Sequence, residues 1–195
     1  MFSNERLHFS VKQVPGSIQA FCEYGDRASE ILESAYPSIG DMLIGGAAEA
    51  IRNVFLTRDA TIFLLYFEDL LVGYSSYWQR QSYSFMDQEM RALSLTERQW
   101  DDMQAKTVMS GWTAIDSQYQ HKGGWSQMMD VYAKSIEESE FLYICRQVRK
   151  ANSYDEKVLQ RYRNQIISQA ETYGYGIQTY FRLRIPKEST LELRK

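Results

Sequence analysis

The residues best suited to chemistry lie in one stretch, residues 114–130, which reads AIDSQYQHKGGWSQMMD. A β-type apolar segment ends at Ile115, a polar turn follows, and the adjacent Gly123 and Gly124 open a stretch with helical spacing. A turn that approaches a phosphate closely needs residues without a Cβ. The free N–H groups and the dipole at a helix N-terminus attract anions. The stretch therefore indicates an anion site at a helix N-terminus, with a plain loop as the alternative.

Two polar side chains in the same turn add to the anion hypothesis. His121 and Lys122 supply a donor and a positive charge directly before the glycine pair. The place of His121 in the turn favours contact with solvent or phosphate over a role as a base. The turn is not a Walker loop, which requires GxxxxGK[ST], and it does not match GxGxxG.

Other residue types that carry chemistry are few. The cysteines, Cys22 and Cys145, make no disulfide framework. Cys145 lies in an apolar strand pattern, where a thiol is usually inert. The histidines, His8 and His121, show no clustered Cys/His spacing. We therefore expect no metal site.

Composition indicates one globular domain over residues 1–195. The chain is 44% hydrophobic and 24% charged, which suits a packed core and argues against wholesale disorder. No apolar run approaches the about 20 residues of a membrane span. The N-terminal MFSNERLHFSVKQ has no apolar signal core, so we expect a cytoplasmic protein without a membrane span.

The charge distribution is uneven. The net charge of −3 argues against general nucleic-acid binding. Residues 141–195, however, hold 11 Lys and Arg against 5 Asp and Glu, whereas residues 1–140 hold 11 against 20. This asymmetry fits solvated faces of opposite sign, or a basic rim for a phosphorylated cofactor or an acidic partner.

Periodicity and turn signals predict the elements that must position the turn. Expected strands span residues 8–14, 60–67, 70–78, 107–115, 141–148 and 177–185. Expected helices span residues 26–35, 45–55, 86–105, 125–138 and 153–172. Ser94 to Glu97 has capping-box spacing and is expected to interrupt the third helix, and Gly73 is expected to mark a bulge. The order of elements predicts a mixed α/β (α+β) layer, with a right-handed crossover over residues 107–148.

The turn resembles the cofactor motif of the GNAT N-acyltransferase superfamily, a strand followed by (Q/R)-x-x-G-x-(G/A) and a helix. Here it reads Gln120-His121-Lys122-Gly123-Gly124-Trp125, in which Gln120 and Gly123 match and Trp125 departs from the family's Gly or Ala. FLLYFEDLLVGYSSYW, Ala151-Asn152 and Tyr173-Gly174-Tyr175 are similar to further family features. The resemblance implies a GNAT-like mixed central sheet of about six to seven strands flanked by helices, with a helical insertion near residues 84–106.

The resemblance also implies a function. It is that of an N-acyltransferase that moves an acyl group from acetyl-CoA or another acyl-CoA to a small-molecule or peptide amine, by direct attack in a ternary complex. The backbone N–H groups of Ile115 and Ser117 would grip the donor, and Asn152 would contact the pantetheine arm or order the helix that follows it. The phosphates would lie on the turn residues Gln120, His121, Lys122, Gly123, Gly124, Trp125 and Ser126.

The acid and base of the reaction are less visible. Family members often carry a tyrosine, as general acid for the thiolate, about eight residues after the asparagine, but position 160 is glutamine. Tyr162 is therefore the candidate, with a core position as the alternative. The fourth expected strand has no carboxylate, and Asp116 just after it is interpreted as a turn residue.

Two alternatives to the enzyme remain open. One is a catalytically inactive GNAT-fold binding or regulatory protein that acts through a protein partner. The other is an unrelated α/β domain, in which Trp125 would pack into the core. A homodimer is also compatible with the sequence. Five basic residues would suit docking of an acidic acyl carrier protein, or would be ordinary surface charges: Arg146, Arg149, Lys150, Arg161 and Arg163.

Overall fold

The computed structural model describes residues 8–37, 45–79, 86–149, 160, 162–174 and 176–187. The chain has a mixed α/β fold in two compact units. Unit 1 comprises residues 1–78 with 111–135, and unit 2 comprises residues 79–110 with 136–195. None of the described helices is long and apolar enough to cross a membrane.

Unit 1 is built on antiparallel strands. They are β1 (Phe9–Pro15), β2 (Thr61–Phe67) and β3 (Leu70–Gln79), and the short β5 (Ala114–Ile115) pairs with β3. The register between β2 and β3 shifts beside Gly73, which confirms the predicted bulge. A side chain at Gly73 would meet the Ala114 carbonyl at 3.0 Å, so this glycine lets β5 approach.

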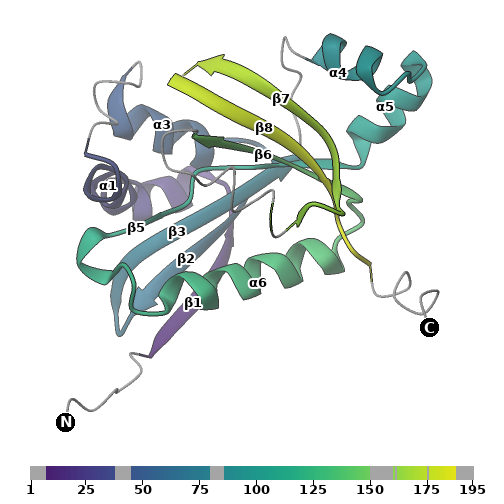
Figure 1. Cartoon of the computed structure of the whole chain (residues 1–195). Coiled ribbons are helices and arrows are strands. Elements are labelled where there is room, and N and C mark those ends of the chain that lie inside the picture. Colours follow the sequence, from purple (N-terminus) through teal and green to yellow (C-terminus); the bar gives the residue numbers. More distant parts are fainter. Residues whose placement is uncertain are drawn as a thin grey trace. The chain divides into compact units, whose positions relative to one another are not determined.

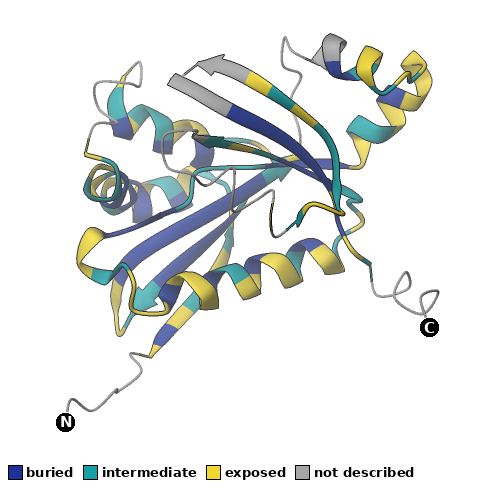
Figure 2. Ribbon diagram, viewed as in Figure 1, coloured by how far each residue is buried: buried dark blue, intermediate teal, exposed yellow. Residues whose placement is uncertain are grey.

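Helices cover the two faces of this sheet (Figure 1). On one face, Ile62 and Leu64 pack in a core with α1 (Ile18–Ala35) and α3 (Gly46–Phe55). On the other face, Phe63 packs against Tyr132 of α6 (Gly124–Glu138), with ring centroids 5.2 Å apart. Successive side chains of a strand point to opposite faces of the sheet. Because helices cover both faces, β2 and β3 are buried along most of their length (Figure 2).

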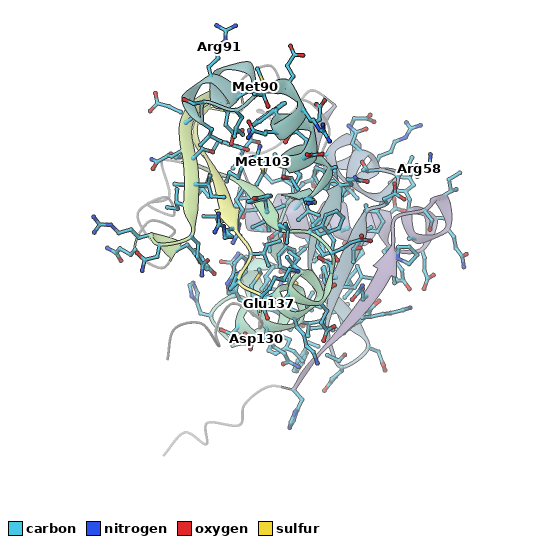
Figure 3. The ribbon with its side chains drawn as sticks, turned by 90° about the vertical axis from the view of Figure 1, so that its right-hand side faces the viewer. Arg58, Met90, Arg91, Met103, Asp130 and Glu137 are labelled. Carbon is cyan, nitrogen blue, oxygen red and sulfur yellow. The ribbon has the colours of Figure 1, made fainter. Side chains whose placement is uncertain are left out.

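The helix boundaries follow from caps. α1 begins earlier than the predicted residue 26, because the Ser17 side chain accepts a hydrogen bond from Ala20 N at 3.0 Å. α6 agrees with the predicted helix to within one residue. Asp130 and Glu137, two turns apart, lie on the exposed side of α6 (Figure 3).

Unit 2 has the strand order β4-β6-β8-β7. The parallel pair is β4 (Thr107–Ser110) with β6 (Tyr143–Arg149). Two antiparallel pairs follow, β6 with β8 (Gly176–Arg184), and β8 with β7 (Ile166–Gly174). The predicted strand 107–115 is therefore two pieces, β4 and β5, separated by residues 111–113.

The predicted helix over residues 153–172 is wrong from Ile166 onward, where β7 forms a hairpin with β8. The i+4 spacing of Tyr162, Ile166 and Ala170 indicated a helix, but residues 166–173 also contain Ile-Ile, Thr and Tyr, which suit a strand. Pairing with β8 decides between the two patterns, because it satisfies the backbone groups of β7. Residues 153–159 and 161 of the predicted helix lie outside the described residues.

The predicted helical insertion is present as α4 (Met86–Ala92) and α5 (Glu97–Ala105). The predicted capping box at Ser94 and Glu97 is wrong by two residues, since Thr96 caps α5 and Gln99 completes the box. Ser94 instead takes φ of 53°, the left-handed conformation that ends α4. Arg91 points outward from α4 (Figure 3), and Met90 and Met103 are half-buried.

A buried ion pair anchors the insertion within unit 2. The Arg182 guanidinium of β8 donates to both Glu89 carboxylate oxygens, at 2.6 and 3.0 Å, and the two side chains are 0% and 3% exposed. Arg182 also donates to Thr107 Oγ1 at 2.8 Å and lies over the Trp100 ring at 5.1 Å. The Ser168 and Tyr180 hydroxyls also donate to the Glu89 carboxylate.

Candidate functional site

The β3–β5 ladder sets the direction of the N–H groups before the turn. Asp116 N donates to Val72 O at 2.8 Å, in the same register as the Gly73–Ile115 pair. Hydrogen-bonded and non-hydrogen-bonded pairs alternate in an antiparallel ladder. The N–H of Ile115 therefore points away from β3, where it is free to face a ligand.

The Ser117 N–H is used differently. It donates to Ser34 Oγ of α1 at 3.1 Å, and the Ser34 and Ser117 hydroxyls lie 2.8 Å apart. The sequence analysis named the N–H groups of Ile115 and Ser117 as donors to the ligand. The Ser117 N–H is bonded to Ser34, whereas the Ile115 N–H points away from β3.

Asp116 ties the start of the turn to α1. Its carboxylate accepts from Arg27 Nη2 at 2.7 Å and from Ser34 Oγ at 3.2 Å, and it caps the short 3₁₀ helix η1 (Ser117–Tyr119) through Gln118 N. Burial alone would lower the pKa of Arg27, but its hydrogen bonds to Glu30 and Asp116 raise that pKa above its ordinary value. Its position as the N-cap of η1 confirms the interpretation of Asp116 as a turn residue, and this residue is 7% exposed.

Sequence reasoning missed Arg27 and Ser34. They lie two helical turns apart, at the edge of the apolar stripe of α1 that contains Ala28, Ile31 and Leu32. Polar residues beside a buried stripe are a weak signal for contact with a neighbouring segment. Nothing in the local pattern identified residues 116–117 as that segment, 82–89 positions away.

The turn itself is held by its backbone and by one amide. Gln120 Nε2 donates to the Ile115 carbonyl at 3.0 Å, which closes the turn on the strand end. His121 and Gly123 have φ of 62° and 93°. No atom lies within 4 Å of a Cβ built on Gly123, so the space in front of this residue is open.

Gly124 lies against other side chains, whereas Gly123 faces open space. A Cβ at Gly124 would lie 2.9 Å from Leu65 Cδ2 and 3.1 Å from the Phe9 ring. Gln127 Nε2 donates to the Phe9 carbonyl at 2.7 Å. The glycine and this amide fix the first turn of α6 against β1 and β2.

The first turn of α6 has the properties of an anion site. Gln127 N bonds to Gly123 O at 3.4 Å, so the N–H groups of Gly124, Trp125 and Ser126 precede the intrahelical ladder. This turn contains no acidic residue. Lys122 is exposed, with Nζ 5.2 Å from the centroid of the Tyr119 ring. Donors, helix dipole and cation together favour negative charge at this position.

Trp125 is 39% exposed. The idea that Trp125 packs into the core, which belonged to the unrelated-domain alternative, is therefore wrong. At helical spacing, Trp125 shares a side of α6 with Met128 and Tyr132, which are buried.

Other sequence candidates belong to unit 2 or lie outside the described residues. Tyr162 is half-buried in the short segment before β7, where its carbonyl accepts from Gln165 N at 2.8 Å. Cys145 is buried and hydrogen-bonds to the Tyr180 hydroxyl at 2.9 Å, as an inert thiol would. Asn152, Lys150 and Arg161 lie outside the described residues.

The basic cluster is only partly described. Arg146 is half-buried and Arg163 is exposed, and the side chain of Arg149 lies outside the described part. Within the described ranges, no three His, Cys, Asp or Glu side chains come together as a metal site would require.

Solved structures share this fold at low sequence identity. A protein described as an acetyltransferase of the GNAT family from Desulfovibrio desulfuricans is 12% identical, with TM-score 0.58 over 92% of this chain and 100% of that chain. FeeM, an N-acyl amino acid synthase from uncultured soil microbes, is 14% identical, with TM-score 0.61 over 92% of both chains. The yncA protein of Salmonella typhimurium, solved with its cofactor acetyl-CoA, is 9% identical, with TM-score 0.52 over 92% and 96%.

The chain has the GNAT fold, which confirms the fold implied by the turn motif. No protein-family model and no curated protein matches the sequence. The fold is therefore assigned from the structural likeness, and the function is inferred from the turn at residues 120–126.

Proposed function

We propose that the protein is an N-acyltransferase that transfers an acyl group from an acyl-CoA to an amine. The observation that carries this proposal is the opening of α6. The N–H groups that precede its intrahelical ladder, the open space at Gly123 and the outward Ile115 N–H all belong to one strand-turn-helix segment in a GNAT fold. The acetyl-CoA bound to a structural neighbour supports the donor class.

The proposed reaction needs three groups. The Ile115 N–H polarises the thioester carbonyl, and the first turn of α6 holds the pyrophosphate. The amine nitrogen attacks the carbonyl carbon, and the C–N bond forms as the C–S bond breaks. One proton leaves the nitrogen, and the coenzyme A thiolate accepts a proton. Tyr162 as the source of that proton stays a prediction.

Several finer features are part of the same proposal. The acceptor is a small-molecule or peptide amine, and the reaction passes through a ternary complex. An acyl carrier protein as donor, a homodimer and a cytoplasmic location stay predictions. An inactive GNAT-fold binding protein is the competing function, because Trp125 replaces a small residue of the family motif. Coenzyme A binding without turnover of any amine would favour it.

Thermal melting with and without coenzyme A tests the binding step. A ligand at 100 times its dissociation constant stabilises by about 2.7 kcal/mol, which corresponds to a rise of roughly 5–11 °C for a chain of this size. Gly123→Asp places a carboxylate beside the bound phosphates, and we expect it to weaken coenzyme A binding by at least about 100-fold.

A matched control separates this effect from backbone strain. Gly46 also has positive φ, at 71°, and also has no atom within 4 Å of a built Cβ, but it opens α3. Gly46→Asp should lower stability to a similar degree and leave coenzyme A binding unchanged. If Gly123→Asp retains the melting shift, the proposed cofactor site is wrong.

A further inference from the structure

Polar side chains at α1 bond to the chain on both sides of β5. Three residues form this set, the α1 clamp: Arg27, Ser34 and Tyr36. Their partners flank the two residues of β5, with Thr113 before the strand and with Asp116 and Ser117 after it. The α1 clamp therefore acts on the segment that contains the Ile115 N–H.

The bond before β5 comes from Tyr36, the C-cap residue of α1. Its hydroxyl donates to the Thr113 carbonyl at 3.0 Å. The Tyr36 ring also packs edge-to-face on the Trp112 ring, with centroids 6.3 Å apart. Because hydrogen bonds are directional, a bond to a backbone carbonyl restricts the orientation of its peptide plane.

The bonds after β5 come from Arg27 and Ser34. Arg27 Nη2 donates to Asp116 Oδ2 at 2.7 Å, while its Nε donates to the Leu71 carbonyl of β3 at 3.1 Å. The Ser34 hydroxyl accepts from Ser117 N at 3.1 Å and donates to Asp116 Oδ1 at 3.2 Å. Arg27 thus joins α1, β3 and the end of β5.

The shortness of β5 explains why it needs such support. The strand is two residues long, and among the described residues it pairs with β3 alone. Ala114 packs in the apolar core of unit 1, but apolar packing is non-directional. The bonds of the α1 clamp therefore add what packing lacks, which is control over the direction of the peptide planes around β5.

The direction of the Ile115 N–H matters for the proposed reaction. This N–H points away from β3, on the side where no described strand pairs with β5. A donor that polarises a carbonyl has to be aimed where the charge develops, and a misplacement of about 1 Å can lower a rate by about 100-fold. Residues that lock such a donor in place act through it, without touching the substrate.

We propose that the α1 clamp positions the Ile115 N–H for acyl transfer. Arg27, Ser34 and Tyr36 hold the backbone on both sides of β5, so that this N–H points at the carbonyl oxygen of the acyl donor. The inference rests on the proposed function. It assigns α1 a role in the chemical step that is separate from phosphate binding at the first turn of α6.

A double clamp variant, Ser34→Ala with Tyr36→Phe, tests this role because it removes two hydroxyls with little change in shape. The matched control is Ser29→Ala with Tyr24→Phe on the same helix. Ser29 Oγ bonds within α1, and the Tyr24 hydroxyl accepts from Lys12 Nζ at 2.7 Å. Neither control hydroxyl bonds to the segment around β5.

Nuclear magnetic resonance relaxation measures the effect of the α1 clamp on the backbone directly. In the wild type and the control, we expect the Ile115 N–H to have an order parameter of about 0.85, the value of rigid backbone. In the double clamp variant we expect it to fall toward about 0.6. If the order parameter is unchanged and no exchange broadening appears at Ile115, the proposal is wrong.

Infrared spectroscopy of acetyl-CoA, isotope-labelled at the thioester carbonyl, measures the aim of the Ile115 N–H. A hydrogen bond to the thioester oxygen lowers the stretching frequency of the carbonyl. We expect a lowered band in the wild type and the control, and less lowering in the double clamp variant. The melting shift caused by coenzyme A should be the same in all three proteins, because the phosphates bind at α6. A merely structural role would change the melting temperature and leave the band in place.

The outcomes separate this inference from the proposed function. A band that is equally lowered in the wild type and the double clamp variant overturns the positioning role and leaves the function standing. A wild-type band at the frequency of unbound acetyl-CoA also overturns it, because the N–H then misses the carbonyl. Absence of a coenzyme A melting shift in the wild type contradicts the proposed function, and with it this inference. Each single variant should show part of both effects, which keeps the test valid if the double variant does not fold.

Discussion

Two regions of this protein differ in whether their polar groups have hydrogen-bond partners within the chain. In unit 2, Arg182 and Glu89 are buried with hydrogen bonds to each other and to the side chains around them. In unit 1, the N–H groups in the first turn of α6 precede the intrahelical ladder, and Tyr74 Oη and Ser76 Oγ of β3 have no hydrogen-bond partner among the described residues. A satisfied network stabilises one arrangement of the chain, whereas unpaired donors lower stability and are available to a ligand.

This contrast teaches where to look for function in a chain of this kind. The unit 2 cluster contains a buried ion pair and a buried thiol, which are the residue types most often associated with chemistry. Its groups are already occupied by one another. The unit 1 turn instead presents backbone N–H groups, which its glycines and its position between a strand and a helix indicate.

The largest expected effect is in the satisfied network. Arg182→Met leaves the Glu89 carboxylate buried without its cation, and breaking such a pair typically costs about 3–5 kcal/mol. Urea unfolding should show this loss. The double variant Glu89→Leu with Arg182→Met should lose less than Arg182→Met alone, because the stranded charge is removed. A double variant that loses the sum of the two single effects would contradict this account.

The second effect concerns the packing of the first turn of α6 against β1 and β2. Gly124→Ala places a methyl group 2.9 Å from Leu65 Cδ2 and 3.1 Å from Phe9. We expect a loss of about 1–3 kcal/mol from overpacking, measured by thermal unfolding. Leu65→Ala in the same protein makes room for the methyl group and should reduce the additional loss. Full stability of Gly124→Ala would show that the helix start can shift freely.

The third effect concerns the ion pair that joins α1 to the turn. Arg27→Met removes the charged donor to Asp116, and we expect a loss of about 1–2 kcal/mol, reduced by partial solvent exposure. In an Asp116→Asn background the same change should cost much less. Arg52→Met, on the exposed side of α3, is the control and should be nearly neutral. Equal losses in both backgrounds would mean that Arg27 acts through Leu71 O and Glu30, without Asp116.

The smallest effect is a dependence of stability on alkaline pH. Burial raises the pKa of Tyr74 in the folded state, so above about pH 10 the unfolded chain releases a proton that the folded protein retains. Stability from this group is present below the unfolded pKa and decreases as pH rises beyond it. Tyr74→Phe should therefore flatten the decline in unfolding free energy between about pH 10 and 11. An identical decline in wild type and variant would contradict the raised pKa.

Much of the scaffold was readable from local pattern. The continuous apolar run of β2, the hairpin to β3 and the stripe of α6 each follow from side-chain spacing, and all three elements form as predicted. The turn was readable because glycines between a strand and a helix have few physical meanings. The helix predicted over residues 153–172 failed because its i+4 spacing coexisted with strand-forming residues, and only the partner strand β8 distinguished them.

The sequence by itself determined the strand-turn-helix unit around Gly123, since chain neighbours and backbone conformation suffice to build it. Tertiary structure alone decided which of its groups are left for a ligand. Arg27 and Ser34 hydrogen-bond to Asp116 and Ser117, which lie more than 80 positions away in the sequence. The Asp116 N–H donates to Val72 O of β3, and the pairing with β3 directs the Ile115 N–H away from that strand. Whether a hydroxyl such as Tyr74 is paired depends on distant segments that meet it, because hydrogen bonds act over a few ångströms of space.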